Sequence, residues 1–262
     1  MPNSNSSPVT HAPLKVLFIH GLESGPGGSK DRYLQDHFDV LTPDMQISLY
    51  RLSKSNSVVR NALRRPLFLG WAAGASISLA CVIILYGPLA WFVWSILVAV
   101  ALAVIWKPLE RQALSASVER CVAIQARAIE GYRPDVVVAS SWGAAIALIC
   151  AARGIYSGPL LLLAPVLQLV YDRLGDADGQ RWKNLCGRIS AEAARRTLIV
   201  HGDQDETVHV AHSRAIAEVA GIELLVIPGG DHSLNSDLVN SAEGRGLNDR
   251  LRQFVVEVAS RG

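Results

Sequence analysis

The feature that most constrains the fold is a short apolar run that passes directly into a helix, between Val136 and Ala145. Three valines and Ala139 are typical of a buried parallel strand, and the small residues that follow predict a helix packed closely on the sheet. Two serines, Ser140 and Ser141, lie at the junction. Because a strand that leads into a helix is the repeating unit of α/β proteins, the stretch predicts a doubly wound, mostly parallel sheet.

The junction reads Ala139-Ser140-Ser141-Trp142-Gly143, which is close to the G-x-S-x-G pattern of a nucleophilic serine on a sharp turn. At such a turn the serine hydroxyl projects above the carboxyl edge of the sheet, and the following helix offers free N–H groups. Ala139 departs from the pattern by one methyl group, and the spacing makes Ser141, not Ser140, the candidate nucleophile. The alternative is a serine that only caps a helix.

An acid and a histidine follow two later strands, in the order that a catalytic serine requires. The predicted strand Thr197–Val200 leads into a loop that carries Asp203 and Asp205, and the next strand leads into a Gly-Gly turn and His232. We favour Asp205 as the acid, with Asp203 as the alternative, since aspartate at that position is also common in turns. We predict that His232 is the base, because the glycine turn lets it reach over the sheet edge.

The first strand, Leu14–His20, runs into a glycine-rich loop. A phosphate-binding P-loop is excluded, because the residues on either side of Lys30 are not the glycine and the serine or threonine that the pattern requires. We predict instead that the loop folds over the serine and presents the backbone N–H of Leu22 to a developing oxyanion. The N–H of Trp142 completes this predicted oxyanion hole.

Residues 66–106 contain no charged side chain and are interrupted near their middle by Gly87-Pro88. The two arms, 67–86 and 89–106, span about 27–30 Å each as helices, which matches the hydrocarbon core of a bilayer. The segment therefore predicts a two-helix transmembrane hairpin inserted into the α/β domain. The alternative is a hydrophobic lid, or a helical pair that dimerises in water.

Basic residues flank the apolar segment on both sides and predict that both of its ends, and the catalytic domain, face the cytoplasm. They are Arg60, Arg64 and Arg65 before it, and Lys107 and Arg111 after it. Small residues four apart favour a homo-oligomer through the hairpin. These are Gly70, Gly74 and Ser78.

The remaining composition limits the domain organisation and the class of partner. The chain of 262 residues is long enough for one α/β domain, which we assign to 14–65 and 107–262, with 1–13 as a disordered tail. A net charge of +2, from 25 basic and 23 acidic residues, gives no reason to expect a nucleic-acid partner. The four cysteines have no paired spacing and no metal-ligand pattern, so we expect reduced thiols and no metal.

Taken together, these motifs resemble the α/β-hydrolase superfamily, and within it the small one-domain bacterial esterases described as YqiA-like. The resemblance covers about half of the chain, and Leu67–Trp106 has no counterpart in it. It implies an α/β-hydrolase fold, a Ser141-Asp205-His232 triad and no metal or organic cofactor. The motifs that carry it are His20-Gly21-Leu22-Glu23-Ser24-Gly25-Pro26 with Ser29 and Lys30, Ser140-Ser141-Trp142-Gly143, Gly202-Asp203 through Val208, and Gly229-Gly230-Asp231-His232.

The expectation from the sequence is thus a membrane-anchored serine hydrolase that cleaves a carboxylic ester or thioester through an acyl-enzyme. Its expected substrate is a small acyl ester, a thioester or a lipid-like molecule, and its expected contact with the membrane is residues 66–106. The alternative is a membrane-tethered binding module that keeps the fold but leaves the triad catalytically idle.

Overall fold

A computed structural model describes residues 13–22, 24–47, 66–238 and 250–262. Nearly all of the predicted N-terminal tail lies outside these ranges. So do three of the basic residues that flank the apolar segment on its N-terminal side, Arg60, Arg64 and Arg65.

The centre of the protein is a six-stranded, fully parallel sheet with the strand order β2-β1-β3-β4-β5-β6. The chain adds strands outward in both directions from β1 and β3 at the centre of the sheet, which is the doubly wound arrangement that the sequence predicts. The strands are β1 (Lys15–Ile19), β2 (Asp39–Leu41), β3 (Val136–Ser140), β4 (Leu160–Leu163), β5 (Thr197–Gly202) and β6 (Glu223–Ile227).

Helices cover both faces of the sheet and create two apolar cores. Alternate residues of a strand point to opposite faces, so Leu17 and Ile19 of β1 join one core while Val16 and Phe18 join the other. The larger core includes residues of α3 (Pro66–Tyr132), α4 (Trp142–Ala152), α5 (Leu167–Arg173), α6 (Gln180–Cys186), α7 (Ala191–Arg195) and α8 (Val210–Ala220). The smaller core includes residues of α1 (Ser29–Gln35) and α10 (Arg250–Ala259), and the short α9 (Asn235–Leu238) lies between β6 and α10.

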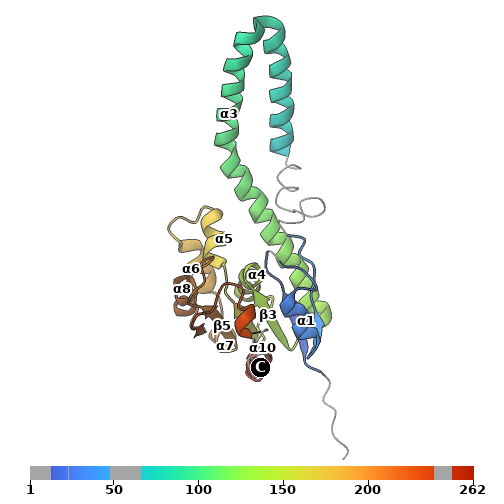
Figure 1. Cartoon of the computed structure of the whole chain (residues 1–262), viewed down its shortest axis with the longest axis vertical. Coiled ribbons are helices and arrows are strands. Elements are labelled where there is room, and N and C mark those ends of the chain that lie inside the picture. Colours follow the sequence, from blue (N-terminus) through green and yellow to red (C-terminus); the bar gives the residue numbers. More distant parts are fainter. Residues whose placement is uncertain (1–12, 23, 48–65, 239–249) are drawn as a thin grey trace, which may run out of the picture.

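The apolar segment belongs to one long helical element, α3, which doubles back on itself at its outer end to give two limbs that project from the body (Figure 1). The second limb continues without a break through Lys107–Arg111 and packs against α4 and β1. The predicted hairpin ends at residue 106, where charged residues resume, whereas the helix continues to Tyr132. A change of polarity marks a change of surroundings and does not itself end a helix, which accounts for the difference.

Apolar side chains on the projecting limbs face solvent. Within the described ranges, one helical stretch, Phe92–Tyr132, is long and apolar enough to cross a membrane, judged by length and composition. The side chains at 79–91, which include the predicted turn at Gly87-Pro88, are not described. More than half of the surface of each of these side chains is exposed: Leu69, Ile77, Phe92, Val93, Ile96, Leu97, Val100, Val104 and Trp106.

The limbs leave the body on the carboxyl side of the sheet. The last residue of α3, Tyr132, lies at the amino edge, where its hydroxyl donates a 2.7 Å hydrogen bond to the carbonyl of Asp39 at the start of β2. About 31 Å earlier along the helix axis, Arg111 lies against Gly175, in the segment that follows β4 and α5. The carboxyl ends of the strands therefore face the same side as the projecting limbs.

Candidate active site

Ser141 occupies a strained turn between β3 and α4. Its backbone angles, φ 54° and ψ −114°, lie in a region that residues with side chains rarely adopt. The Ser141 N–H donates a 2.8 Å hydrogen bond to the carbonyl of Leu163 at the end of β4, which holds the turn in place. Gly143 is required here, since a Cβ at that position would lie 2.1 Å from the carbonyl oxygen of Ile19.

Three side chains from three strand ends form a continuous hydrogen-bonded chain. The Nε2 atom of His232 lies 2.9 Å from the Oγ of Ser141, and its Nδ1 atom lies 2.7 Å from Oδ2 of Asp205. A carboxylate only accepts hydrogen bonds, so Nδ1 carries the proton and Nε2 is free to accept the serine hydroxyl proton. The structure therefore brings the predicted nucleophile, base and acid together in the orientation that a catalytic triad needs.

The carboxylate of Asp205 is fully buried, and its second oxygen is held by the backbone. Oδ1 accepts hydrogen bonds from the N–H groups of Thr207 and Val208 at 2.8 Å and 2.7 Å. These bonds leave Oδ2 directed at the imidazole of His232. A buried carboxylate with this many donors is a fixed negative charge that can stabilise an imidazolium.

Asp203, the alternative acid, has a different position. Its Oδ1 atom accepts a 2.7 Å hydrogen bond from the N–H of Gly229, and its own N–H donates to the carbonyl of Ile227. Asp203 thus shapes the turn that leads to His232. Among the described contacts, its carboxylate makes no bond to the His232 ring.

The loops that carry the acid and the base touch each other directly at two glycines. A Cβ on Gly202 would lie 2.1 Å from the carbonyl oxygen of Gly230. The Gln204 N–H donates a 3.0 Å hydrogen bond to that same carbonyl. The Gly-Gly turn is therefore needed so that the two loops can approach each other closely, in addition to letting His232 reach over the sheet edge.

A second histidine contacts the triad acid. Buried His201 places Nε2 3.0 Å from Oδ2 of Asp205 and 2.8 Å from the carbonyl of Val208, and its Nδ1 lies 2.6 Å from the Oγ of Ser213. Since a carbonyl only accepts, Nε2 carries the proton and Nδ1 accepts from the serine. Burial lowers the pKa of His201 below its ordinary value, against the opposing effects of Val208 and Asp205. His201 stands at the end of a strand, before a glycine, and nothing in its local sequence indicates its contact with the acid.

The loop after β1 lies against the serine, as the sequence analysis expects. A Cβ on Gly21 would be 3.4 Å from the Cβ of Ser141, and the Gly21 N–H donates to Oγ of Ser24 at 3.0 Å. Buried His20 fixes the loop, because its Nδ1 bonds the Gly21 carbonyl at 2.8 Å and its Nε2 accepts from the N–H of Met45 at 3.2 Å. The residue that follows Gly21 is Leu22, whose N–H remains the predicted oxyanion donor.

The other predicted oxyanion donor, the N–H of Trp142, belongs to the first turn of α4. N–H groups in the first turn of a helix have no acceptor within the helix, so they are available to a ligand. Ser141 and Trp142 are adjacent in the chain, which keeps this N–H close to the serine in any conformation of the loop.

Lys30 connects the first loop to the loop of the histidine, and its role was not foreseen from the sequence. From α1, its Nζ donates hydrogen bonds to the carbonyl of Ser233 and, at 2.9 Å, to Oδ1 of Asn235. Burial lowers the pKa of Lys30 to about 8, although the charge of Asp231 acts in the opposite direction. No local pattern indicates this contact, because its partners lie more than 200 residues away in sequence.

The described residues contain no group of three or more histidine, cysteine or acidic side chains that could hold a metal ion. Three free cysteines, Cys121, Cys150 and Cys186, are buried in the apolar core. Burial raises their pKa values, to about 11 for Cys121, so these thiols are poor nucleophiles at neutral pH. Ser213 is also hydrogen-bonded to a histidine, but it is fully buried, whereas Ser141 is partly exposed and therefore accessible to a substrate.

Comparison with known proteins identifies the fold of this chain but does not assign the chain to a family. No family model and no curated protein matches the chain. The solved structures that resemble it include a protein from Thermus thermophilus (TM-score 0.53, 14% identity, 95% of this chain and 90% of the other). They also include Est1E from Butyrivibrio proteoclasticus (0.51, 15%, 95% and 89%) and a monoacylglycerol lipase from Paleococcus ferrophilus (0.51, 12%, 96% and 96%). At this level of identity the likeness shows the fold, which is that of the α/β hydrolases.

Proposed function

We propose that the protein is a serine hydrolase that cleaves a carboxylic ester or a thioester through an acyl-enzyme intermediate. The observation that carries this proposal is the hydrogen-bonded chain from Ser141 through His232 to Asp205 at the carboxyl edge of an α/β-hydrolase fold. The YqiA-like esterase motifs in the sequence support the same chemistry.

In the proposed mechanism, Nε2 of His232 accepts the hydroxyl proton of Ser141 as Oγ attacks the carbonyl carbon of the substrate. The resulting imidazolium keeps its Nδ1 proton on Asp205, whose buried charge stabilises it. The N–H groups of Leu22 and Trp142 stabilise the tetrahedral oxyanion. The imidazolium then protonates the leaving alcohol or thiol, and a water molecule, activated by His232, releases the acid from the serine.

We further propose that the projecting limbs of α3 form a two-helix hairpin that spans a membrane, with the catalytic domain on the cytoplasmic side. Residues 66–106 carry no charge, and their exposed apolar side chains, of which 51–69% of the surface faces solvent, would each favour insertion by about 1–2 kcal/mol. Because the limbs leave the body on the carboxyl side of the sheet, the anchored domain turns the edge that carries Ser141 toward the bilayer. This orientation favours an acyl lipid, a lipid-like thioester or an acylated protein as substrate.

The test of the hydrolase proposal is turnover by the full-length chain in a neutral detergent, with 4-nitrophenyl esters and acyl thioesters of graded chain length. We expect hydrolysis that is lost in Ser141→Ala and retained in Ser140→Ala. Absence of hydrolysis by a folded native chain, for every substrate tested, would favour the membrane-tethered binding module with an idle triad.

The test of the anchor is separate from the test of the chemistry. Membranes that contain the full-length chain are washed with alkaline carbonate, and we expect the protein to stay in the membrane pellet. Quantitative release into the supernatant would exclude integral insertion and leave the lid or the soluble helical pair.

A further inference from the structure

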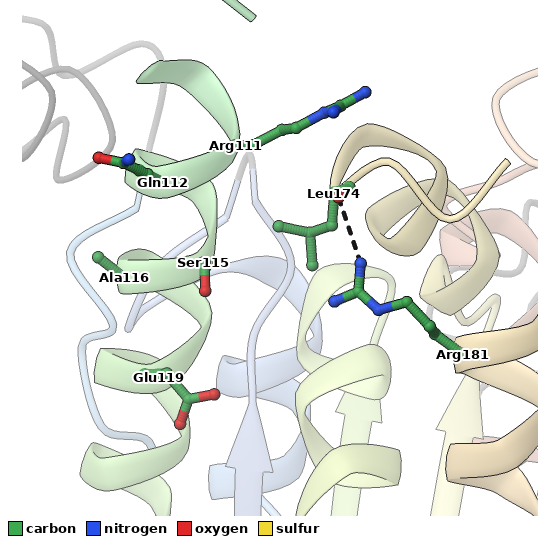
Figure 2. Close-up of a pocket in the computed structure, with 7 residues that line it drawn as sticks. All are labelled: Arg111, Gln112, Ser115, Ala116, Glu119, Leu174 and Arg181. Carbon is green, nitrogen blue, oxygen red and sulfur yellow. Dashed lines mark hydrogen bonds between the residues drawn. The ribbon is translucent and has the colours of Figure 1, made fainter. Parts of the chain in front are cut away.

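A pocket separate from the Ser141 site lies at the base of the projecting limbs, between α3 on one side and the end of α5 and the start of α6 on the other. Its volume is about 480 Å³. Figure 2 shows its lining, in which Arg111, Ser115 and Glu119 come from α3 while Leu174 and Arg181 come from the other wall. Two guanidinium groups, from opposite walls, thus line one small pocket.

The structure holds both walls of this pocket in place. The Arg111 guanidinium lies against Gly175, which has a φ of 88°. The missing side chain makes room for Arg111, since a Cβ at Gly175 would be 2.7 Å from Cζ of Arg111. Arg181 donates from Nη1 to the carbonyl of Leu174 at 3.3 Å. A salt bridge of 3.5 Å between Arg173 and Glu110 ties α5 to α3 just beside the pocket.

The acidic neighbours of the pocket offset only part of its positive charge. Arg153 donates two hydrogen bonds of 2.7 Å to the Glu119 carboxylate. These bonds lower the pKa of the Glu119 carboxyl group, and the charge of Arg153 offsets that of Glu119. The carboxylate of Asp176 accepts hydrogen bonds from the backbone N–H groups of residues 181 and 182, and its charge partly offsets that of Arg181. Within the described part of the chain, no carboxylate forms a salt bridge with Arg111 or Arg181. The pocket is therefore suited to an anion.

In the anchored protein, the pocket lies at the level of the lipid headgroups. The uncharged segment ends at Trp106, and Arg111 follows five residues later on the same unbroken helix. That separation is about 7.5 Å along the axis. The headgroup region of a bilayer is about 5–7.5 Å thick on each side of the hydrocarbon core, so the backbone of Arg111 lies at the outer edge of this layer, where its side chain can reach lipid phosphates.

We propose that this pocket binds the phosphate group of an anionic phospholipid in the leaflet next to the α/β domain. Arginine pairs with phosphate through two parallel N–H···O bonds, and two arginines on facing walls are suited to one phosphodiester. Bound lipid then links α3 to α5 and fixes the distance between the carboxyl edge of the sheet and the membrane surface. The inference rests on the proposed membrane anchor and does not depend on the proposed hydrolase chemistry.

The experiment is a titration of the full-length chain, purified in a neutral detergent, with short-chain phosphatidylglycerol while the midpoint of thermal unfolding is recorded. We expect the lipid to raise the midpoint of the native chain. In the double variant Arg111→Gln/Arg181→Gln, the concentration for half of the effect should rise at least about tenfold, because charge-assisted hydrogen bonds are lost. The matched control is Arg127→Gln/Arg195→Gln, which removes the same charge from exposed positions outside the pocket and should behave as the native chain does.

Two further ligands identify the source of the phosphate. Short-chain phosphatidylcholine, which has no net charge, should give a smaller shift than phosphatidylglycerol, and inorganic phosphate or glycerol phosphate at equal concentration should give little shift. An equal shift with the soluble phosphates would overturn the lipid assignment in favour of a soluble phosphate ester. An equal response of the native chain and the pocket variant would overturn the pocket itself.

The carbonate wash and the Ser141-dependent turnover are run on the same preparations. If the native chain resists carbonate and hydrolyses esters but shows no response to phosphatidylglycerol, the inference fails while the proposed function stands. If carbonate releases the native chain, the anchor fails first, and the lipid inference fails with it.

Discussion

Nε2 of His201 lies 3.0 Å from Oδ2 of Asp205, so the acid of the candidate triad shares one carboxylate oxygen between two imidazoles. One imidazole, His232, faces the serine, and the other is fully buried behind the acid. His201 thus acts on the nucleophile only through Asp205, which makes it a positioning residue.

His201→Leu removes the N–H donor from Asp205, and we expect kcat/KM to fall about tenfold. Without that donor, the Asp205 carboxylate attracts the protonated imidazole of His232 more strongly, so the acid limb of the pH profile of kcat/KM moves to higher pH. His201→Gln, which can still donate, should restore part of both effects, whereas Ser213→Ala leaves the Nε2 bond intact and should change little. A loss of stability in His201→Leu with an unchanged pH profile would leave His201 a purely structural role.

The two candidate acids are separated by paired substitutions. Asp205→Asn should lower kcat by about 10⁴-fold, since the amide cannot hold the imidazole in the required tautomer or stabilise its charge. Asp203→Asn keeps an oxygen that accepts from the Gly229 N–H, so its effect should stay within a fewfold. Equal losses in steady-state kinetics of the two variants would contradict the assignment.

Lys30 should matter for catalysis although it does not touch the serine. Lys30→Met keeps most of the buried volume but removes the hydrogen bonds to Ser233 and Asn235 that tie α1 to the loop after His232. We expect kcat to fall about tenfold with KM little changed, because the base is less well placed. Lys183→Met, at an exposed position on α6, is the matched control. The prediction is wrong if the two variants have the same kcat.

Acid should destabilise the protein through its two buried histidines. Burial lowers the pKa of both His20 and His201 from the ordinary value of 6.5. Below pH 6.5 the unfolded chain therefore binds protons that the folded chain does not, so the free energy of unfolding is steady above that pH and falls below it. The slope is up to about 1.4 kcal/mol per pH unit for each histidine.

The measurement for this prediction is the thermal midpoint at pH 7.5 and at pH 5.5. The native chain should lose more stability between the two than His201→Gln does, because the variant lacks one of the two histidines. The account of His201 is contradicted if both lose the same amount.

Much of the fold could be predicted because local patterns agree with it. Strand ends followed by glycine or by polar residues indicated where β1, β3, β5 and β6 stop, and the order of serine, acid and histidine indicated which ends meet. In α10, the apolar residues Leu251, Val255 and Val258 recur at helical spacing and are buried.

The remainder depends on contacts between distant parts of the chain. Three features are visible only in the tertiary structure. They are the bond from Lys30 to the histidine loop, the contact of His201 with Asp205, and the presence of Arg111 and Arg181 in one pocket. The continuity of α3 through Lys107 was also missed, because a change from apolar to charged residues looks like an element boundary in the sequence. None of these features has a local pattern from which it could have been found.

The measurement that tests the central claim most directly is labelling of the membrane fraction with a fluorophosphonate probe, which reacts with activated serines. The native chain, Ser140→Ala and Ser141→Ala are compared at equal expression. The account predicts labelling of the native chain and of Ser140→Ala, and none of Ser141→Ala. Labelling that persists in Ser141→Ala, or a folded native chain that is not labelled, would contradict an activated serine at the turn between β3 and α4.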